Sequence, residues 1–595
     1  MKSFLSKKNK YIFVLIFIFF LTNNISYNIM QMIITLKIGW SLNFVDSILE
    51  LRDYYFLFGN ILMLLLAFLI VLKYDKNFKL LFKSSDKLPM VDGAYEYGSS
   101  RFMNKREIKQ NFKIWDIGKD LEYGGIPVTY LDNKFYYDNS FNHTLIVGST
   151  GSGKTVGLIF PLVYNLASAG ESMIINDTKG EIYCNTADYL KQKGYDIKII
   201  NLRDALASDG WNPLHLPYKY YKAGNIDEAG DLIENFSKSL TKNLSSKDMY
   251  WEKSATSVLS ALCYAIIEDA PRESQVNLYS IYNMLVEHGA KTINRQNSLD
   301  MYFQDRPFGN LAKNSYATGS FAKGETRATL FSVLSTVIKI FADTGIANLT
   351  SRTDFELEDI GNKKTAVFLI IPDEKQSRHE LASLFIDQCY QALVNTAQNN
   401  PDGKLPIRTN FILDEFANMP AIPNISNKVT VSRGRNMRFY FVIQDFGQLK
   451  ETYKEASSII KSNCTNWVYL LTADNDTAKE ISNRLGKYTI SSSRVSTSSR
   501  IEQTDFNISN DKSLMGRELL QSDELMRFQY GESLFIKSRM LPVKATTLPF
   551  DKYGFNIKKV HIPSEHKDYT IDVFNLDEFR SNKLKREIDS LIDLE

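Results

Sequence analysis

Cysteine and histidine are scarce in this sequence, with four and six residues in 595. The cysteines, Cys184, Cys263, Cys389 and Cys464, are far apart, and none has a C-x-x-C partner. This pattern excludes a disulfide framework and a cysteine-based zinc site, and it is typical of a reducing cytosol. The histidines show no H-E-x-x-H spacing, so the sequence gives no sign of a zinc-protease site either.

A large excess of either charge is also lacking. The chain has 71 Lys and Arg against 68 Asp and Glu, a formal net charge of +3. Composition alone therefore does not indicate a nucleic-acid partner. The hydrophobic content of 44% and the charged content of 23% are ordinary for a globular protein. At 595 residues the chain is too long for one core, so we expect two or more domains.

Long apolar runs are confined to the N-terminal part. Residues 54–72 form an uncharged run of nineteen residues, which predicts a transmembrane helix. An earlier run, 11–21, also fits the core of a signal peptide, but no small-x-small cleavage site follows it. It reaches spanning length only by extending to about residue 34. We expect a membrane anchor over 1–82 with segments at about 11–34 and 54–72, and leave open whether the first is a full span.

Lysines set the expected orientation of this anchor. Four precede the first apolar run, and Lys73, Lys76, Lys79 and Lys83 follow the second. The positive-inside rule places both flanks in the cytoplasm. The segment 35–53 then faces outward and is too short for a receptor domain. The sequence thus predicts a multi-pass plasma-membrane protein, embedded in membrane lipid, with a large cytoplasmic part.

The most informative stretch is a complete G-x-x-x-x-G-K-[ST] loop between an apolar strand and a plausible helix. Its residues are Gly148, Ser149, Thr150, Gly151, Ser152, Gly153, Lys154 and Thr155. The glycines let successive backbone N–H groups point at phosphate oxygens, and Lys154 reaches the outer phosphates. The Thr155 hydroxyl is placed to ligate Mg²⁺. This loop predicts a site for nucleotide phosphates and Mg²⁺.

The order of apolar segments predicts a parallel sheet interrupted by helices. Strands at 172–176 and 196–202, with a helix at 180–193 between them, begin a β-α-β-α-β series. A β-hairpin is expected between 88 and 141. From about 217 to 342, apolar residues recur at steps of three and four, which indicates an inserted helical domain with these residues in its core. Strands return at 366–371, 410–413, 439–443, 467–471 and 533–537.

These patterns give a domain division. The Ser/Thr-rich run 489–500 is expected to be a mobile loop, and the tail after about 563 to be a short helix or disordered. After the anchor, the predicted parts are a first nucleotide-binding segment, an inserted all-α domain, a second nucleotide-binding segment and a C-terminal tail, at 83–216, 217–342, 343–562 and 563–595.

A second part of the site is predicted where the strand 411–413 ends in two acids. In a P-loop enzyme, the strand beside the phosphate loop ends in an aspartate that holds Mg²⁺, the role expected of Asp414. Glu415 is then placed to polarise the attacking water as general base. Asp414 lies 260 residues beyond Lys154 (414 − 154), which is far more than a minimal P-loop domain needs, and the helical insertion accounts for most of that excess.

Two further features are candidate parts of the site. Arg433 and Arg435 lie between the acidic strand and the next, where an arginine could face a neighbouring subunit's γ-phosphate. Gln444 ends the strand 439–443, where a polar side chain could sense that phosphate. A solvated basic turn is the alternative for the arginines, and a role outside the site is the alternative for Gln444.

With these residues in order, the chain resembles the type IV secretion coupling proteins of the TraG/TraD family. Its N-D-T-K-G-E stretch is similar to the family's D-P-K-G-E, with Thr178 where proline is usual. The similar motifs, besides the phosphate loop, are G-S-S-R-F at 98–102, N-D-T-K-G-E at 176–181, W-N-P-L at 211–214, W-E at 251–252, T-R at 326–327, L-D-E-F at 413–416, G-R at 434–435, Gln444, N-C at 463–464, L-G at 485–486 and G-R-E-L-L at 516–520.

The resemblance implies an α/β fold class, a RecA-like P-loop nucleotide-binding domain with an inserted all-α domain and two N-terminal transmembrane helices. It also implies an ATPase that uses ATP and Mg²⁺, assembles as a homohexamer and recruits DNA with a covalently attached relaxase. The DNA would pass through a channel built from type IV secretion ATPases and membrane subunits. By the same resemblance Arg435 is the better arginine-finger candidate, with Arg433 beside it still possible.

Three alternatives stay open beside a DNA-transfer motor. The first is a coupling protein that passes protein effectors only, since no base-reading motif is visible. The second is an FtsK-like DNA pump, although the tail leaves no room for that family's winged C-terminal domain. The third is a substrate receptor that binds nucleotide without hydrolysis, which the intact Lys154, Thr155, Asp414 and Glu415 disfavour. An ABC-type ATPase is not indicated, because no L-S-G-G-Q-like string occurs.

Overall fold

The computed structural model describes residues 95–242, 249–321, 324–372, 378–498, 507–555, 558–567 and 569–592, with a few residues among the first 94. The chain divides into two compact units, Met1–Ala94 with Ile490–Met515, and Tyr95–Thr489 with Gly516–Glu595. Every candidate residue of the nucleotide site belongs to the second unit.

The predicted membrane spans lie largely outside the described residues. Residues 23–29 and 31–33, within the first predicted span, are helical, and only Ile61 is described in the second. Among the residues that the structure describes, no single helix has the length and apolar character needed to cross a bilayer; one sharply bent pair, Glu325–Ala342 with Thr344–Thr350, satisfies both criteria jointly. The anchor stays a prediction.

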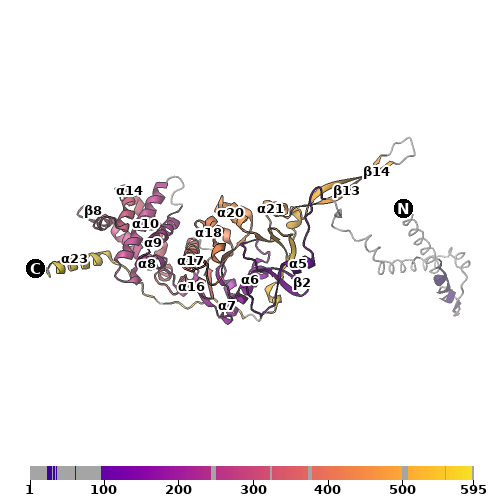
Figure 1. Ribbon diagram of the computed structural model, residues 1–595, viewed down its shortest axis with the longest axis horizontal. Helices are drawn as coiled ribbons and strands as arrows, with labels where there is room; N and C mark the ends of the chain where they lie inside the picture. Colours follow the sequence, from indigo (N-terminus) through magenta and orange to yellow (C-terminus); the bar gives the residue numbers. More distant parts are fainter. Residues whose placement is uncertain are drawn as a thin grey trace. The chain divides into compact units, whose positions relative to one another are not determined.

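A nine-stranded sheet forms the centre of the second unit, and its strand order is β16-β15-β12-β4-β11-β10-β5-β9-β6. Figure 1 shows the chain as a ribbon. The strands from β12 to β6 pair in parallel, and β15 and β16 add an antiparallel edge. All eight strands predicted within this sheet are present, and β16 is additional. Their bounds are β4 (Thr144–Gly148), β5 (Ser172–Asp177), β6 (Asp196–Asn201), β9 (Thr365–Ile370), β10 (Thr409–Leu413), β11 (Met437–Ile443), β12 (Asn466–Leu471), β15 (Glu532–Lys537) and β16 (Val543–Thr546).

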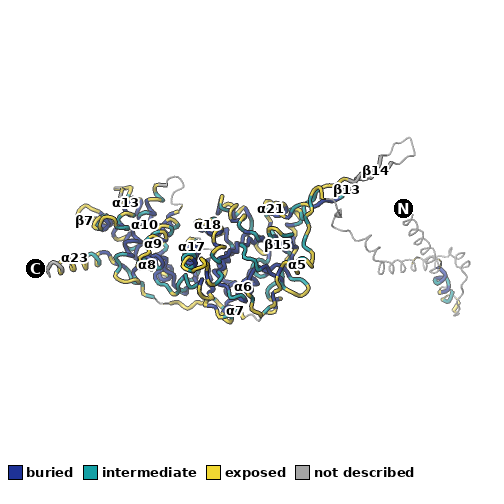
Figure 2. The backbone as a smooth tube through the Cα atoms, in the orientation of Figure 1, coloured by how far each residue is buried: buried dark blue, intermediate teal, exposed yellow. Residues whose placement is uncertain are grey.

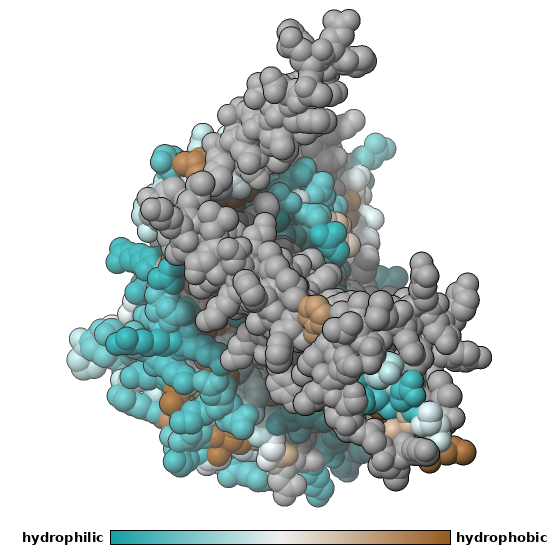
Figure 3. Space-filling model, turned by 90° about the vertical axis from the view of Figure 1, so that its right-hand side faces the viewer, coloured by the Kyte–Doolittle hydropathy of each residue, from teal (hydrophilic) through white to brown (hydrophobic). Residues whose placement is uncertain are grey.

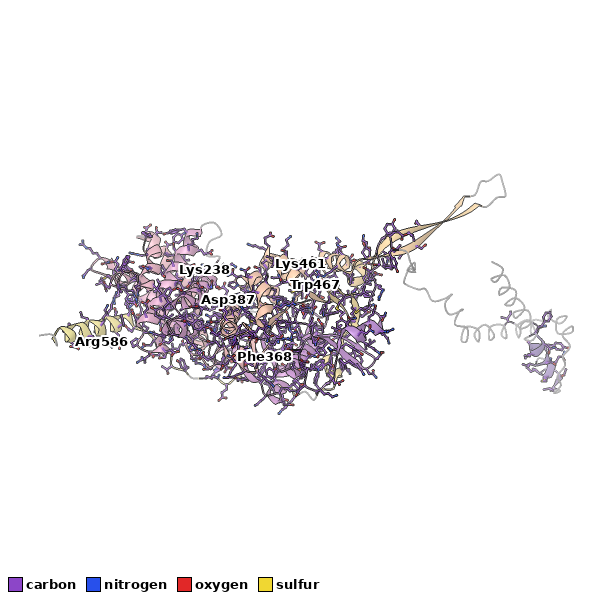
Figure 4. All side chains as sticks on the ribbon, in the orientation of Figure 1. Lys238, Phe368, Asp387, Lys461, Trp467 and Arg586 are labelled. Carbon is purple, nitrogen blue, oxygen red and sulfur yellow. The ribbon has the colours of Figure 1, made fainter. Side chains whose placement is uncertain are left out.

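The central strands are buried on both faces, as expected for parallel strands that read as continuous apolar runs (Figure 2). Successive residues of β4 enter different cores: Leu145 and Val147 belong to one hydrophobic cluster, and Ile146 belongs to the other. Phe368 in β9 and Trp467 in β12, both labelled in Figure 4, are 0% and 1% exposed. Because both faces are buried in hydrophobic cores, the sheet is a rigid support for the residues of the site.

Helices cover the two faces of the sheet. Helices α6 and α7 contribute to the cluster that contains Ile146, and α17 contributes to the other. The described surface visible in Figure 3 is mainly hydrophilic, with isolated apolar side chains. The helices outside the insertion are α5 (Lys105–Asn111), α6 (Phe160–Ser168), α7 (Glu181–Gln192), α16 (Asp359–Asn362), α17 (His379–Gln398), α18 (Ile425–Ser432), α19 (Phe446–Tyr453), α20 (Ala456–Asn463), α21 (Asn475–Leu485), α22 (Ser522–Leu525) and α23 (Leu576–Ile592).

Between β6 and β9 the chain is almost entirely helical, close to the stretch predicted as an insertion. Apolar residues such as Ile233, Phe236 and Leu262 are buried together, so the predicted role of these stripes in core packing is confirmed. One small hairpin, β7 (Thr292–Ile293) with β8 (Gln296–Asn297), interrupts the helices. The helices are α8 (His215–Lys222), α9 (Ile226–Thr241), α10 (Met249–Asp269), α11 (Leu278–Ala290), α12 (Ser298–Gln304), α13 (Leu311–Ser320), α14 (Glu325–Ile338) and α15 (Thr344–Thr350).

A small antiparallel sheet precedes the phosphate loop. It has the order β1-β3-β2, with β1 at Lys113–Trp115, β3 at Lys134–Asp138 and β2 at Ile126–Leu131. The pairing of β2 with β3 confirms the predicted hairpin between 88 and 141.

The prediction of a mobile loop over 489–500 is wrong for its described part. Residues Lys487–Ser498 form strand β13, which pairs with β14 (Asn507–Glu518) in a two-stranded sheet. Hydroxyl-bearing and β-branched residues fit a pleated ribbon, and we had interpreted their low hydrophobicity as a loop. The tail after 563 contains α23, which settles the choice between a helix and disorder for that segment.

A buried charge network joins the amino ends of the central strands to the hairpin before the phosphate loop. Arg438 in β11 is 1% exposed and donates to Glu171 Oε2 at 2.7 Å and to Asn410 Oδ1 at 2.8 Å. Glu171 also accepts from Arg408 at 3.1 Å and from the backbone N–H of Gly124 at 2.8 Å. Each charged group is thus paired and hydrogen-bonded, the condition under which buried charges are tolerated.

Removing Arg438 therefore has a large expected cost. In an Arg438→Leu variant, the free energy of unfolding falls by about 3–5 kcal/mol, because Glu171 and Asn410 lose a buried partner. The matched control is Arg527→Leu, whose pair with Asp523 is exposed and contributes at most about 1 kcal/mol. Urea unfolding of both variants measures the difference. Equal losses for the two would contradict this role of the network.

Candidate nucleotide-binding site

The phosphate loop connects the carboxyl end of β4 to the helix that follows it. Gly151 and Gly153 have φ angles of +79° and +84°, a region that glycine enters without strain. The N–H of Ser149 donates to the backbone oxygen of Leu471 in β12 at 2.8 Å, which fixes the start of the loop. One turn of π-helix, Thr155–Ile159, then leads into α6. The helix N-terminus is therefore presented to the loop, as phosphate binding requires.

The loop borders a cavity of about 280 Å³. The cavity contains six of the eight predicted loop residues together with Asp414 and Glu415, so the fold brings the two predicted halves of the site together. The described residues that line it are Ser149, Thr150, Gly151, Gly153, Lys154, Thr155, Val156, Thr178, Lys179, Glu181, Asp414, Glu415 and Tyr530.

Lys154 lies against the loop that it belongs to. Its Nζ donates to the backbone oxygen of Gly148 and, at 3.2 Å, to that of Ser149. Burial lowers the pKa of the Lys154 ammonium, and the carboxylates of Asp414 and Glu415 oppose this shift. The ammonium is therefore a poorly solvated charge beside the space where phosphates would lie, and it gains from an anionic ligand.

Asp414 is placed by the register of the sheet. Leu413 of β10 pairs with Asn176 of β5, and the Asn176 side-chain amide donates to the backbone oxygen of Asp414 at 2.5 Å. The pKa of Asp414 is raised to about 7, mainly by burial; the charge of Lys154 lowers it, and the charges of Glu415 and Asp177 add to the rise. Asp177, at the end of β5, has a pKa raised to about 6 by burial.

Glu415 turns sharply out of the strand. Its φ is +51°, a left-handed conformation that costs a non-glycine residue on the order of 1 kcal/mol or more. Its N–H donates to Asp414 Oδ1 at 3.0 Å, and its Oε2 accepts from Asn418 at 3.1 Å. Asn418 was missed in the sequence analysis, and it holds the side chain expected to act on water.

The donor set of the cavity fits Mg²⁺. The Thr155 hydroxyl and the Asp414 carboxylate both line it, and both are hard oxygen ligands. Mg²⁺ in phosphate-transferring sites is held by one or two protein groups together with the phosphates of the substrate. The Thr155 hydroxyl, at the end of the phosphate loop, and the Asp414 carboxylate, just after β10, meet that requirement.

The remaining candidates lie outside the cavity. Gln444 follows β11, which lies between β4 and β10, but it is not among the described residues that line the cavity. Arg433 and Arg435 form a 3₁₀ turn just before β11, at the amino ends of the parallel strands. They therefore lie at the edge of the sheet opposite their own phosphate loop, and the role predicted for them is at the phosphate of a neighbouring subunit. That role stays a prediction.

Sequence analysis also missed Tyr530 and did not assign Thr178, Lys179 and Glu181 to the site. The last three belong to the N-D-T-K-G-E stretch, which follows β5 and so shares the edge of the sheet where the parallel strands end. Their position could have been inferred from that order. Tyr530 lies in no recognisable motif.

A P-loop nucleotide-binding site on a RecA-like α/β sheet defines the class of this protein. Within that class, residues 100–566 match the family model described as "Type IV secretory system Conjugative DNA transfer", and the chain belongs to this family. The resemblance noted from the motifs is confirmed.

Curated relatives and solved structures agree with this assignment. The chain is 25% identical over 417 residues to the conjugal transfer protein TraG of Escherichia coli, covering 67% of this chain and 63% of that one. It is 27% identical over 407 residues to the protein VirD4 of Rhizobium radiobacter, covering 67% and 55%. The aligned part is thus less than two thirds of the length of either relative.

The fold is shared with the conjugative coupling protein TrwB. An unbound form of TrwB superposes with a TM-score of 0.54 at 15% identity, covering 76% of this chain and 96% of that one. TrwB in complex with the ATP analogue ADPNP gives 0.54 at 14% identity, covering 77% and 96%. At these identities the likeness establishes the fold.

The raised pKa of Asp414 predicts how stability depends on pH without nucleotide. The folded chain binds this proton more tightly than the unfolded chain, whose aspartate has a pKa near 3.8. The stabilisation is complete below that value and is lost as the pH rises through about 7.

Asp414→Asn removes this titration. Relative to wild type, the variant should gain stability as the pH rises from 4 to 7, by up to about 1.4 kcal/mol per pH unit. Thermal unfolding of the two proteins at several pH values measures the difference. Parallel curves across this range would contradict a buried carboxyl that stays protonated near neutrality.

Proposed function

We propose that this protein is a membrane-anchored ATPase that recruits a relaxase–DNA substrate and powers its transfer through a type IV secretion channel. The observation that carries the proposal is the convergence of Lys154, Asp414 and Glu415 on one cavity beside an intact phosphate loop. Family membership supplies the substrate class, since the family is described by conjugative DNA transfer, TraG is a conjugal transfer protein and TrwB is a plasmid coupling protein.

In the proposed mechanism, ATP with Mg²⁺ supplies the reacting phosphoryl group and its charge, as the TrwB complex with ADP and Mg²⁺ suggests for the family. The loop N–H groups and Lys154 bind the phosphates. Thr155 and Asp414 would hold the metal, with Asp414 in its deprotonated form and the proton released to solvent. Glu415, held by Asn418, orients and polarises the attacking water.

The mechanism is completed across a subunit boundary. In a homohexamer, the amino edge of one sheet would face the phosphate loop of its neighbour, and Arg435 would stabilise the charge that develops on the transferred phosphate. Arg433 is the alternative finger. Gln444, which ends the strand between the two halves of the site, is the proposed sensor of the γ-phosphate. The predicted N-terminal spans would keep this ring beside the ATPases and membrane subunits of the channel.

Two substitutions separate binding from chemistry. In purified full-length protein, Lys154→Ala should abolish ATP binding and hydrolysis, because the outer phosphates lose their cation. Glu415→Gln should retain binding and lower kcat by about 10²–10⁴-fold, because the general base is lost. Glu451→Gln, on an exposed position of α19, is the control and should behave as wild type.

Hydrolysis is measured with and without single-stranded DNA. Stimulation by DNA that disappears in both variants supports the proposal. Normal turnover by Glu415→Gln would contradict the assigned base. If hydrolysis is stimulated only by a protein substrate, the proposed function changes from DNA transfer to protein transfer.

The finger is tested by mixing inactive variants. Arg435→Ala should bind ATP normally and lose about 10³–10⁵-fold in kcat, the usual effect of removing an arginine finger. When Arg435→Ala and Glu415→Gln subunits are mixed, some interfaces join an intact glutamate to an intact arginine, and part of the activity should return. A mixture as inactive as its components would contradict action between subunits. Arg433→Ala measured beside it decides between the two arginines.

A further inference from the structure

One aromatic side chain in the nucleotide cavity has no part in the mechanism above. Tyr530 lies in the turn between α22 and β15 and is 62% exposed. Its ring touches the phosphate loop, because a Cβ added to Gly153 would lie 2.8 Å from Tyr530 Cε2. Among the described residues that line the cavity it is the only aromatic one. A large apolar ring with a solvent-exposed face, in a polar cavity, is unusual enough to require a function.

The turn that carries Tyr530 is held in place on both sides. The N–H of Thr547, after β16, donates to the backbone oxygen of Gly531 at 2.8 Å. The N–H of Gln529 donates to Glu532 Oε2 at 3.0 Å. Gly531 itself has a φ of +89°, which sets the direction of the turn. The ring is therefore presented to the loop by a fixed backbone.

The order of strands in the sheet determines which residues lie at each end of the cavity. Tyr530 precedes β15, and only β12 separates β15 from the loop-bearing strand β4. Because β15 is antiparallel to β12, the start of β15 lies at the edge where β12 ends. Asp414 and Lys179 follow β10 and β5, on the other side of β4. The charged groups are thus at one end of the cavity and the aromatic ring at the other, with the phosphate loop between them.

We propose that Tyr530 stacks on the base of the bound nucleotide. This inference rests on the proposed ATPase function and adds the base-binding residue. With the outer phosphate directed to Asp414 and Glu415, the base must extend towards the opposite end, where Tyr530 supplies an aromatic face. Stacking uses the π-face that every base has, so Tyr530 contributes affinity without choosing between adenine and guanine.

The test compares ligands with and without a base. The purified full-length protein is titrated with ATP, GTP and inorganic tripolyphosphate, each with Mg²⁺, by calorimetry. Tyr530→Ala should lower the affinities for ATP and for GTP by a similar factor, about tenfold or more, and leave the affinity for tripolyphosphate unchanged. Tyr530→Phe should keep wild-type affinity for all three. Tyr95→Ala, which removes a tyrosine that is 69% exposed and outside the cavity, is the control.

Each other outcome overturns the proposal in a distinct way. If Tyr530→Ala lowers the affinities for ATP and for tripolyphosphate equally, the ring acts through the phosphate loop and not on the base. Unchanged ATP affinity would show that it does not contact the nucleotide. Wild-type protein that binds neither ATP nor tripolyphosphate would overturn the proposed ATPase function and this inference together, whereas loss confined to Lys154→Ala would leave the ATPase function standing.

Discussion

The half-buried side chain of Lys154 and the buried carboxyl of Asp414 share one small cavity. Burial lowers the pKa of Lys154 and raises that of Asp414, so each resists its charged form. Lys154 is hydrogen-bonded to carbonyls of its own loop. If nucleotide phosphates and Mg²⁺ bind as proposed, they would favour the charged forms of both groups, and binding would then be coupled to proton release from Asp414. Because burial disfavours the charged forms of both groups, the electrostatic free energy of the site favours binding of a charged ligand.

The long separation of these two residues in the sequence follows from the topology of the sheet. The helical insertion leaves the sheet after β6 and returns at β9, and these two strands are direct neighbours in parallel register. A parallel pair needs a crossover connection in any case, and the cost of closing a longer one grows slowly with its length. The insertion can therefore be large without disturbing β4, β5 and β10, which carry the site.

Local sequence was sufficient for the features that depend on local chemistry. Continuous apolar runs gave the buried strands, and the loop and the two acids at 414–415 were recognisable from residue types alone. The strand β16, of only four residues, and the polar ribbon β13 gave no such signal. Tyr530 was missed for a different reason. It reaches Gly153 only because the antiparallel edge strands return the chain to the phosphate loop, and no pattern near residue 530 records that path.

The arginines show how the fold itself indicates assembly. Arg435 lies at the amino edge of the sheet, and its backbone is fixed there: its oxygen accepts from Leu405 N–H at 3.2 Å, and the Asn436 side chain donates to the Leu405 oxygen at 3.0 Å. The buried Arg438 network begins three residues further along the chain, in β11. A guanidinium on so firmly held a turn is positioned for a partner, and its own cavity lies at the other edge. The proposed role of Arg435 as an arginine finger therefore requires the phosphate loop of another subunit, since its own loop lies at the opposite edge of the sheet.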